Sequence, residues 1–352
     1  MKKVLIVLAC IIGVIILAVG GFLAVFAIKE YRPEDVEDVK VENAGSGTLS
    51  AGTPVSILTY NVGYGALSAD QECYFDGGQT VIPESEEIIK RNTEGIARIL
   101  KEENADINLL QEVDRNAKRS YYIDELPIFQ KATGQSTMFA TNFNVFYVPF
   151  NKGMGKVDAG IVTMTGYKVN SATRYQLPIS FSWPISMVNL KRCLLETRIP
   201  VQGTDKELVL VNLHLEAYDS GEGKVAQTKQ LMDLLSKELK AGNYVIAGGD
   251  YNQTFEPVLN KYPMTQDTIA NDKWQPGTVN NSDLVEGFSF AISDNGPTAR
   301  LGDHPLDATT QLYIIDGFIV SNNITVNEVK NLDTGFAYSD HNPVKMSFTL
   351  QQ

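Results

Sequence analysis

The most constraining feature of the sequence is an uncharged apolar run of 25 residues at positions 4–28. The run is longer than the apolar region of a secretory signal peptide, which has about 7 to 15 residues. As a helix it is long enough to cross the ~30 Å hydrocarbon core of a bilayer with some tilt. We therefore predict a transmembrane anchor over residues 1–29. A cleaved signal peptide is the alternative, because Val25 and Ala27 fit the small-residue positions of a cleavage site.

The charges that flank this run predict its orientation. Lys2, Lys3 and the terminal amine precede it, whereas the basic residues that follow it are soon diluted by acidic ones. Because Lys and Arg are enriched on the cytoplasmic side, we expect the N-terminus inside the cell and the rest of the chain outside. The predicted location is the cell membrane, with a single pass and an extracytoplasmic domain.

Two regions follow the anchor. Residues 30–53 are first acidic and then rich in Gly and Ser, without apolar periodicity, which predicts a flexible stalk. Residues 54–352 contain no comparable linker and no internal repeat. We expect this part to form one compact α/β or α+β domain.

The charge of the chain limits its partners. The sequence carries 30 Lys and Arg against 42 Asp and Glu, a net charge of −12. Beyond residue 30 the imbalance is larger, with 27 basic and 41 acidic residues. An acidic body opposes the capture of polyanions, so we expect no stable nucleic-acid complex. It is also repelled by an anionic membrane surface, which leaves the anchor to hold it there.

The cysteines exclude two classes of protein. Only Cys10, Cys73 and Cys193 are present, too few for a disulfide scaffold or a four-cysteine zinc site. A pairing of Cys73 with Cys193 stays open, because separation in sequence says nothing about geometry.

Apolar strand-like segments alternate with helical stretches in the domain. Helices are predicted from Ser85 to residue 104 and over 223–240, where apolar side chains recur at helical spacing. Segments rich in β-branched and apolar residues predict the strands. These are 55–61, 106–113, 159–165, 192–200, 208–215, 244–249, 313–320, 324–330 and 343–350.

Polar side chains stand at the ends of these strands. One such residue means little, because Asn and Asp commonly begin turns. Here several strands deliver a carboxylate, amide or imidazole, and two of the three histidines are among them. Carboxylate and amide oxygens bind Mg²⁺ or Ca²⁺, and a His beside a carboxylate can act as a general acid or base. The residues are Asn61, Glu112, His214, Asp250, Asn252, Asp316, Asp340 and His341.

The order of these segments resembles a known superfamily. The sequences YNVG, LQEVD, NLHLE, GGDYN, IIDGFIV and SDHNPV are similar to motifs of the endonuclease/exonuclease/phosphatase superfamily. That superfamily includes pancreatic-type deoxyribonucleases, abasic-site endonucleases, inositol polyphosphate 5-phosphatases and neutral sphingomyelinases. The resemblance covers about residues 54–350. It implies a four-layer αββα sandwich of two mixed β-sheets flanked by helices, with the strand ends converging on one cleft.

The resemblance also implies a metal site. Glu112 would be the principal ligand, and Asn61 and Asp340 would complete or orient the metal shell. Because the ligands are oxygen or imidazole groups without a thiolate cluster, Mg²⁺ or Mn²⁺ is expected in preference to Zn²⁺.

Five positions match the family's catalytic residues. Asp316 would hold and polarise His341 beside the scissile phosphate, where the imidazole acts as a base or as an electrostatic clamp. Asp250 would position or deprotonate the attacking water, and Asn252 would bind a phosphate oxygen. His214 would be the second imidazole, which donates to the phosphate or the leaving oxygen. A neighbouring carboxylate can keep a His protonated at neutral pH.

Other positions carry weaker expectations. Arg192, which precedes a strand, is a candidate for phosphate binding, whereas His304 lies among turn residues and is expected to be structural. The long loop after Asn61 contains a tight-turn sequence at residues 76–78. The aromatic segment 181–187 could face lipid or the core, and the core is favoured.

The predicted function is a membrane-anchored, extracytoplasmic, Mg²⁺-dependent phosphohydrolase. It would cleave a phosphodiester or phosphomonoester by in-line attack of an activated water. The substrate stays open among a lipid headgroup, a nucleic acid and an inositol or sugar phosphate. The alternative is a non-catalytic surface binding protein on the same fold, which would have no need of the full set of polar residues. The sequence does not indicate an oligomeric state.

Overall fold

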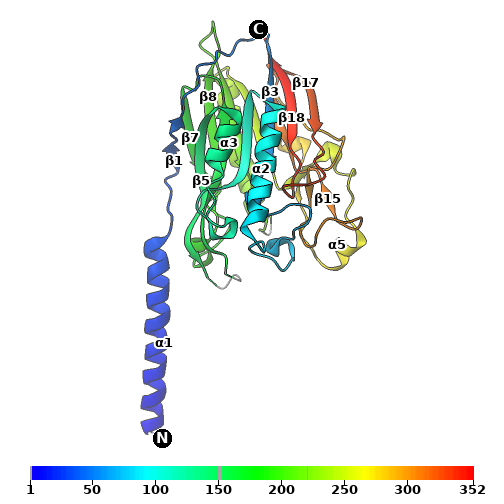
Figure 1. Ribbon diagram of the computed structural model, residues 1–352. Helices are drawn as coiled ribbons and strands as arrows, with labels where there is room; N and C mark the ends of the chain where they lie inside the picture. The colour runs from blue at the N-terminus through cyan, green and yellow to red at the C-terminus, as the bar shows by residue number, and fades with distance from the viewer. Residues whose placement is uncertain (1, 150–152, 220) are drawn as a thin grey trace.

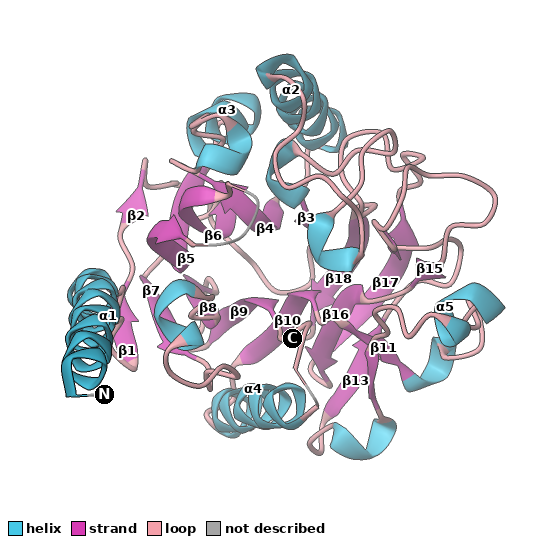
Figure 2. Cartoon of the chain, turned by 90° about the horizontal axis from the view of Figure 1, so that it is seen from below, coloured by secondary structure: helices cyan, strands magenta, loops and turns pink. Residues whose placement is uncertain are grey.

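The computed structural model describes residues 2–149, 153–219 and 221–352. Over these residues the domain is built on two seven-stranded mixed β-sheets that lie face to face (Figures 1 and 2). The first sheet contains, in spatial order, β1 (Val36–Asp38), β7 (Ser171–Gln176), β8 (Cys193–Pro200), β9 (Glu207–His214), β10 (Tyr244–Asp250), β16 (Asp316–Ser321) and β13 (Phe288–Ala291). The second contains β17 (Ile324–Asn331), β18 (Val344–Leu350), β3 (Pro54–Asn61), β4 (Ile107–Asp114), β6 (Gly155–Thr165), β5 (Ser136–Val148) and β2 (Val41–Glu42).

Each sheet has one parallel pair near its centre. These pairs are β9 with β10 and β3 with β4, and the other neighbouring strands of the two sheets run antiparallel. Two small sheets complete the strands of the described residues: β11 (Gln253–Phe255) with β12 (Gly277–Val279), and β14 (Ala299–Arg300) with β15 (Leu312–Tyr313).

Helices cover the outer face of each large sheet (Figure 2). α2 (Glu86–Glu103) and α3 (Leu126–Thr133) pack on the second sheet, where Ile96 and Phe129 share a buried cluster with Leu58. α4 (Glu222–Lys240) packs on the first sheet, where Leu231 lies in a cluster with Val211. The short α5 (Gln266–Ala270) lies outside these layers. The four-layer αββα sandwich expected from the sequence is confirmed.

The main core lies between the sheets and follows from the two-residue period of the strands. In β9, Leu208 and Leu210 point into the cluster between the sheets, whereas Val209 and Val211 point outward to α4. In β3, Ile57 points between the sheets. The central strands are therefore apolar on both faces, as their sequences require.

Several elements differ from the sequence prediction. The strand expected at 313–320 is divided into β15 and β16, because the backbone N–H groups of Ile315 and Asp316 donate to the Thr298 hydroxyl instead of to a strand. α3, β5 and β7 were not predicted. α3 is too short to show a clear helical period, and polar Thr and Asn interrupt the apolar pattern of β5.

The N-terminal helix α1 (Lys2–Lys29) is long and apolar enough to cross a membrane, and it projects from the domain (Figure 1). The segment 30–53, expected to be a flexible stalk, lies against the domain instead. Its strands β1 and β2 add to β7 and β5 at one edge of each sheet, and Leu49 forms a bridge to Val201. Backbone pairing at open sheet edges is the physical reason, and composition alone did not reveal it.

All three cysteines are free. Cys73 and Cys193 are buried in different core clusters, so the pairing left open by the sequence is not formed.

Candidate functional site

The strand period and register bring the predicted polar residues together at one end of the sandwich. β3, β4, β9 and β10 end there, and β16 begins there. In the first sheet, Asp250 lies directly opposite His214 on β9 and opposite Asp316 on β16. Side chains two residues apart share a face, so these groups continue the line of apolar residues between the sheets.

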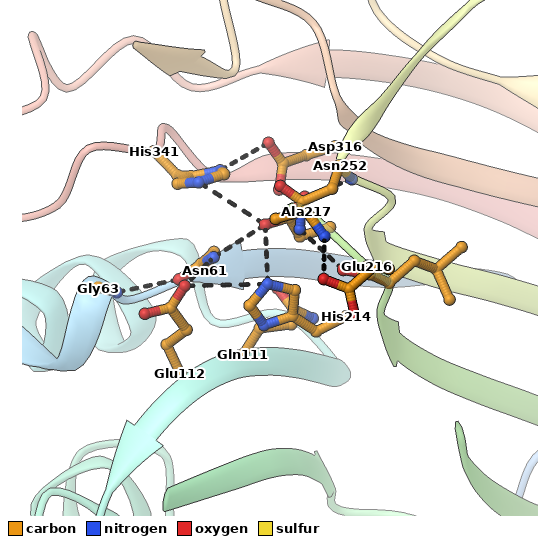
Figure 3. Close-up of polar contacts among 12 residues, drawn as sticks. Asn61, Gly63, Gln111, Glu112, His214, Glu216, Ala217, Asn252, Asp316 and His341 are labelled. Atoms are coloured by element: carbon orange, nitrogen blue, oxygen red, sulfur yellow. Dashed lines mark hydrogen bonds and ion pairs between the residues drawn. The ribbon is translucent and has the colours of Figure 1, made fainter. Parts of the chain in front are cut away.

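Asn61 connects the two sheets at this end (Figure 3). Its Nδ2 donates to Oε1 of Glu112 at 3.0 Å and to Oδ2 of Asp250 at 2.9 Å. Its Oδ1 accepts from the backbone N–H of Gly63 at 3.0 Å. Asn61 therefore orients two carboxylates.

A β-bulge aims the Glu112 side chain. The pairing of β4 with β6 shifts register between Leu110 and Val113, and Glu112 has a positive φ of 56°. Bulges re-aim side chains, and a residue other than glycine in this region costs about 1 to 3 kcal/mol of strain. The side chain remains 24% exposed, in contrast to its buried neighbours. Burial nevertheless raises the pKa of Glu112 above its ordinary value, although the charge of Arg119 opposes the shift.

His341 is held as an imidazolium. Its Nδ1 lies 2.8 Å from Oδ2 of Asp316, and its Nε2 lies 3.7 Å from Oδ2 of Asp250. Burial alone would lower the pKa of His341, but the charges of Asp316 and Asp250 raise it well above the ordinary value. Because a carboxylate can only accept, Nδ1–H donates to Asp316 and Nε2–H points toward Asp250.

His214, in contrast, is a neutral imidazole. Its Nε2 lies 3.5 Å from Oδ2 of Asp250 and 3.9 Å from Oε1 of Glu112 (Figure 3). Burial and the positive charge of Arg192 lower the pKa of His214 well below its ordinary value. The expectation that a neighbouring carboxylate keeps the imidazole protonated therefore holds for His341 and not for His214.

Asp250 is the central carboxylate of the site. Its Oδ2 faces Asn61, His214 and His341, and its Oδ1 accepts from the backbone N–H of Asn252 at 2.8 Å. Burial raises the pKa of Asp250 to about 6, although the charge of His341 opposes the shift. A group with this pKa changes protonation near neutral pH, as a general base must.

Asp340 and Asn252 lie at the same cavity. Burial, against the opposing charge of His341, raises the pKa of Asp340 to about 6, and the charge of Glu112 adds to the shift. Asn252 has a positive φ of 51°, and its Nδ2 donates to the backbone carbonyl of Leu215.

Two carboxylates offer hard oxygen donors for a divalent cation. Glu112 and Asp340 both line the cavity, and the negative charge of the first disfavours ionisation of the second. Such crowding of acids in a buried place is relieved by a cation, and oxygen ligands suit Mg²⁺ or Mn²⁺. A second group, Asp250, Asp316 and His341, also places its ligand atoms within 4.8 Å of one another. We interpret that group as an imidazolium held by acids, because His341 Nδ1 already donates to Asp316.

Arg192 and His304 occupy different environments. Arg192 is buried, lines the cavity, donates from a guanidinium N–H to the His214 carbonyl at 3.2 Å, and lies 3.6 Å from Glu216. The Arg192 Nε–H has no hydrogen-bond partner among the described residues, so it is available to donate to an oxygen of a ligand. His304 contacts Asp303 at 2.7 Å in a loop and is absent from the described cavity lining.

A buried amide layer supports the site and was given no role from the sequence. Gln111 Nε2 donates to Asn212 Oδ1 at 2.8 Å and to the Thr59 hydroxyl at 3.2 Å. Asn212 in turn donates to the carbonyl of Val162 at 2.8 Å. These polar residues precede Glu112 and His214 on strands that are otherwise apolar, which is the signal that could have identified them.

A cavity of about 450 Å³ opens over these groups. Its polar lining includes Glu112, Arg192, His214, Asp250, Asn252, Asp340 and His341, together with Asp76, Arg119, Asn142 and Arg300. Asn61 and Asp316 are not part of the described lining and hydrogen-bond to Asp250 and His341. The rest of the lining includes residues of the aromatic segment 181–187. We predicted that this segment is part of the core. The prediction is wrong at Trp183 and Ile185, whose side chains are 64% and 56% exposed.

Comparison with known proteins identifies the fold. No protein-family model matches the sequence, and no curated protein matches it. Among solved structures, an endonuclease/exonuclease/phosphatase from Beutenbergia cavernae is 18% identical, with a TM-score of 0.57 over 85% of this chain and 72% of that one. One from Bacteroides vulgatus is 15% identical, with a TM-score of 0.54 over 85% of this chain and 100% of that one. ANGEL2, a 2′,3′-cyclic phosphatase, is 16% identical, with a TM-score of 0.56 over 92% of this chain and 100% of that one.

These likenesses show that the chain has the endonuclease/exonuclease/phosphatase fold. The superfamily resemblance read from the sequence is confirmed at the level of the fold.

Proposed function

We propose that this chain is a metal-dependent hydrolase of phosphate esters. The observation that carries the proposal is the arrangement around Asp250, where one carboxylate meets a protonated and a neutral imidazole and an oriented amide. Pairs of titratable groups whose pKa values are pushed apart are typical of acid–base sites. The description of ANGEL2 as a 2′,3′-cyclic phosphatase on the same fold supports this reaction class.

The residues divide the reaction among them. Asp250 positions the attacking water and accepts its proton. The His341 imidazolium, held by Asp316, and Arg192 face the negative charge of the phosphoryl oxygens. The water oxygen bonds to phosphorus, the bond from phosphorus to the leaving oxygen breaks, and the proton that Asp250 accepted from the water passes to the leaving oxygen. His214 approaches the same Asp250 oxygen as His341 and is the proposed donor of a hydrogen bond to the substrate.

Mg²⁺ or Mn²⁺ is the proposed cofactor, and Glu112 and Asp340 would hold it. Once bound, the ion would polarise a phosphoryl oxygen and offset its charge. Asn61 keeps Glu112 in place through the hydrogen bond to Oε1.

The first prediction concerns this ion. Excess chelator should abolish hydrolysis, and Mg²⁺ or Mn²⁺ should restore it. Glu112→Gln keeps the shape of the side chain and removes the charged ligand, so it should raise the metal concentration for half-maximal activity by at least about 10-fold. Activity titrations against Mg²⁺ for wild type and variant measure this. Undiminished turnover in chelator would exclude a required metal ion.

We also propose that α1 anchors the protein in the cell membrane, with residues 54–352 as the catalytic domain outside. The 30–53 segment would connect them. The support is the length and apolar character of α1 and the basic residues before it.

The second prediction tests this topology. The protein should sediment with membranes, and protease added to intact cells should degrade its domain. A shortened protein in the soluble fraction would point to cleavage of the N-terminal segment, full-length soluble protein would contradict the membrane anchor, and protection of the domain until lysis would point to the opposite orientation.

A panel of soluble phosphodiesters and phosphomonoesters, assayed with Mg²⁺, Mn²⁺ and Ca²⁺, tests the activity itself. We expect no stable nucleic-acid complex, given the acidic charge of the body. The absence of turnover on every ester with every metal would favour the alternative, a binding protein that uses the same fold without catalysis.

A further inference from the structure

The cavity over the catalytic groups has an apolar side that the hydrolysis of a phosphate group does not require. This side extends from the polar part toward the loop between β7 and β8. That loop contains the short 3₁₀ helix η4 (Ile185–Val188). The apolar lining there is Phe143, Val148, Phe181, Ile185, Val188 and Leu190.

Large apolar side chains are exposed on the two segments that supply this lining, the loop between β7 and β8 and the end of β5. Ile179, Trp183 and Ile185 have exposed fractions of 45%, 64% and 56%, and Tyr147 at the end of β5 has 47%. We call these four residues the apolar rim. Contiguous exposed apolar surface on a soluble domain marks a place that contacts another apolar phase or partner.

The apolar rim lies near the C-terminal end of α1, the end that joins the domain. The ring of Phe26, in the last turns of α1, packs on Phe146 with ring centroids 4.9 Å apart. Lys191, in the loop between β7 and β8, forms a 2.9 Å ion pair with Glu30, the residue after α1. The ion pair and a contact of α1 with η4 hold the end of α1 beside the loop that lines the cavity, and the Phe26–Phe146 contact holds it beside β5.

The orientation of the domain fits this contact. α1 projects from the end of the domain opposite the C-terminus (Figure 1). The C-terminus follows the end of β18, whereas His341 precedes its beginning, so the catalytic groups lie at the end from which α1 projects. If α1 crosses a membrane, the cavity and the apolar rim face that membrane.

We infer that the substrate is a phosphate-ester lipid of the membrane that α1 crosses. This inference rests on the proposed function. The phosphate group lies at Asp250 and His341, and the first methylene groups of the lipid tails lie on the apolar side of the cavity. Trp183 and Ile185 enter the interface, where aromatic and apolar side chains are stable. Hydrolysis breaks one ester bond of the lipid phosphate by the steps above and consumes only water.

The test uses the full chain reconstituted in vesicles. The vesicles contain phosphatidylcholine, phosphatidylethanolamine, phosphatidylglycerol and phosphatidic acid, and Mg²⁺ is present. Phosphorus NMR measures the loss of each lipid, and bis(p-nitrophenyl) phosphate in the same sample measures turnover of a soluble diester. We expect wild type to hydrolyse at least one of the lipids faster than the soluble diester.

Variants of the apolar rim sharpen the test. Trp183→Ser and Ile185→Ser should each lower the ratio of lipid turnover to soluble-diester turnover by about 10-fold, because each loses apolar contact with the interface. Ile269→Ser is the matched control. Ile269 is 54% exposed on α5, and α5 and α1 lie on opposite sides of the domain in both Figure 1 and Figure 2. The control should leave the ratio unchanged, and melting midpoints should confirm that all three variants fold.

Each contrary outcome has one meaning. Turnover of the soluble diester without loss of any lipid would overturn the lipid inference and leave the proposed function standing. Faster cleavage of a DNA or RNA oligonucleotide than of lipid would also overturn it. If the ratio of lipid turnover to soluble-diester turnover were the same in the rim variants as in Ile269→Ser, the apolar rim would have no role in binding the lipid. Turnover of none of these substrates would reject the proposed function, and the inference with it.

Discussion

Replacing Asp250 with asparagine is expected to lower kcat by about 10² to 10⁴-fold, the range for the loss of a positioned acid or base. Asparagine has the same shape but cannot accept a proton from water at neutral pH. The buried carboxylate has a pKa of about 6, so it is largely ionised at neutral pH and still basic enough to act. The measurement is kcat on a saturating soluble phosphodiester with Mg²⁺, together with the melting midpoint.

The control for this variant is Asp205→Asn. The Asp205 side chain is 85% exposed in the turn between β8 and β9, at the end of the sandwich away from the site. It should leave kcat within a few-fold of wild type. If Asp250→Asn retained most of the activity, Asp250 could not be the base, and the assignment built around it would be wrong.

The second large effect is expected at the imidazoles. His214→Ala and His341→Ala should each lower kcat by about 10² to 10⁴-fold. His304→Ala should leave kcat within a few-fold, because the His304 side chain hydrogen-bonds only within its own loop among the partners described for it, and the backbone carbonyl that accepts from Arg300 is kept.

Stability separates the two imidazoles. The Nδ1 of His214 has no hydrogen-bond partner among the described residues, and the side chain borders the cavity, so His214→Ala should change stability little. His341→Ala instead leaves the buried Asp316 carboxylate without its cation. Breaking a buried pair in this way costs about 3 to 5 kcal/mol of unfolding free energy.

The double variant His341→Ala with Asp316→Asn distinguishes catalysis from folding. Removing the uncompensated charge of Asp316 should restore most of the melting midpoint while kcat stays low, because the imidazole is still missing. Asp316 acts as a positioning residue, so the kcat effects of the two changes should be far from additive. Recovery of activity together with stability would mean that His341 has a structural role only.

The sequence by itself predicted the fold and the site because both depend on short periodicities. The two-residue period places Asp250 and His214 on the inner face of their strands, continuous with Ile246 and Leu210 of the core. The polar residues lie near the ends of strands that are neighbours in the sheet. When these strands pair, the polar residues are therefore brought together at one edge. The uncharged run at residues 4–28 likewise predicted a helix that could cross a membrane, which depends on length and composition alone.

Local pattern could not predict contacts between distant segments. The pairing of residues 30–53 with the sheet edges depends on which edges remain open after folding. The exposure of Trp183 depends on where its loop meets the end of α1, because an aromatic segment has the same composition in a core and at a surface. The separate burial of Cys73 and Cys193 is also a consequence of packing.

The charge states of the two histidines were decided only by the tertiary structure. Both imidazoles lie at strand ends close to acids, so the sequence gives no reason to distinguish them. In the folded domain His341 lies between Asp316 and Asp250, whereas His214 lies nearer to the positive charge of Arg192. Because a pKa responds to burial and to all charges nearby, it is fixed by the three-dimensional arrangement of several strands. The sequence determined which groups meet at the site, and the packing of the two sheets decided which of them carries the proton.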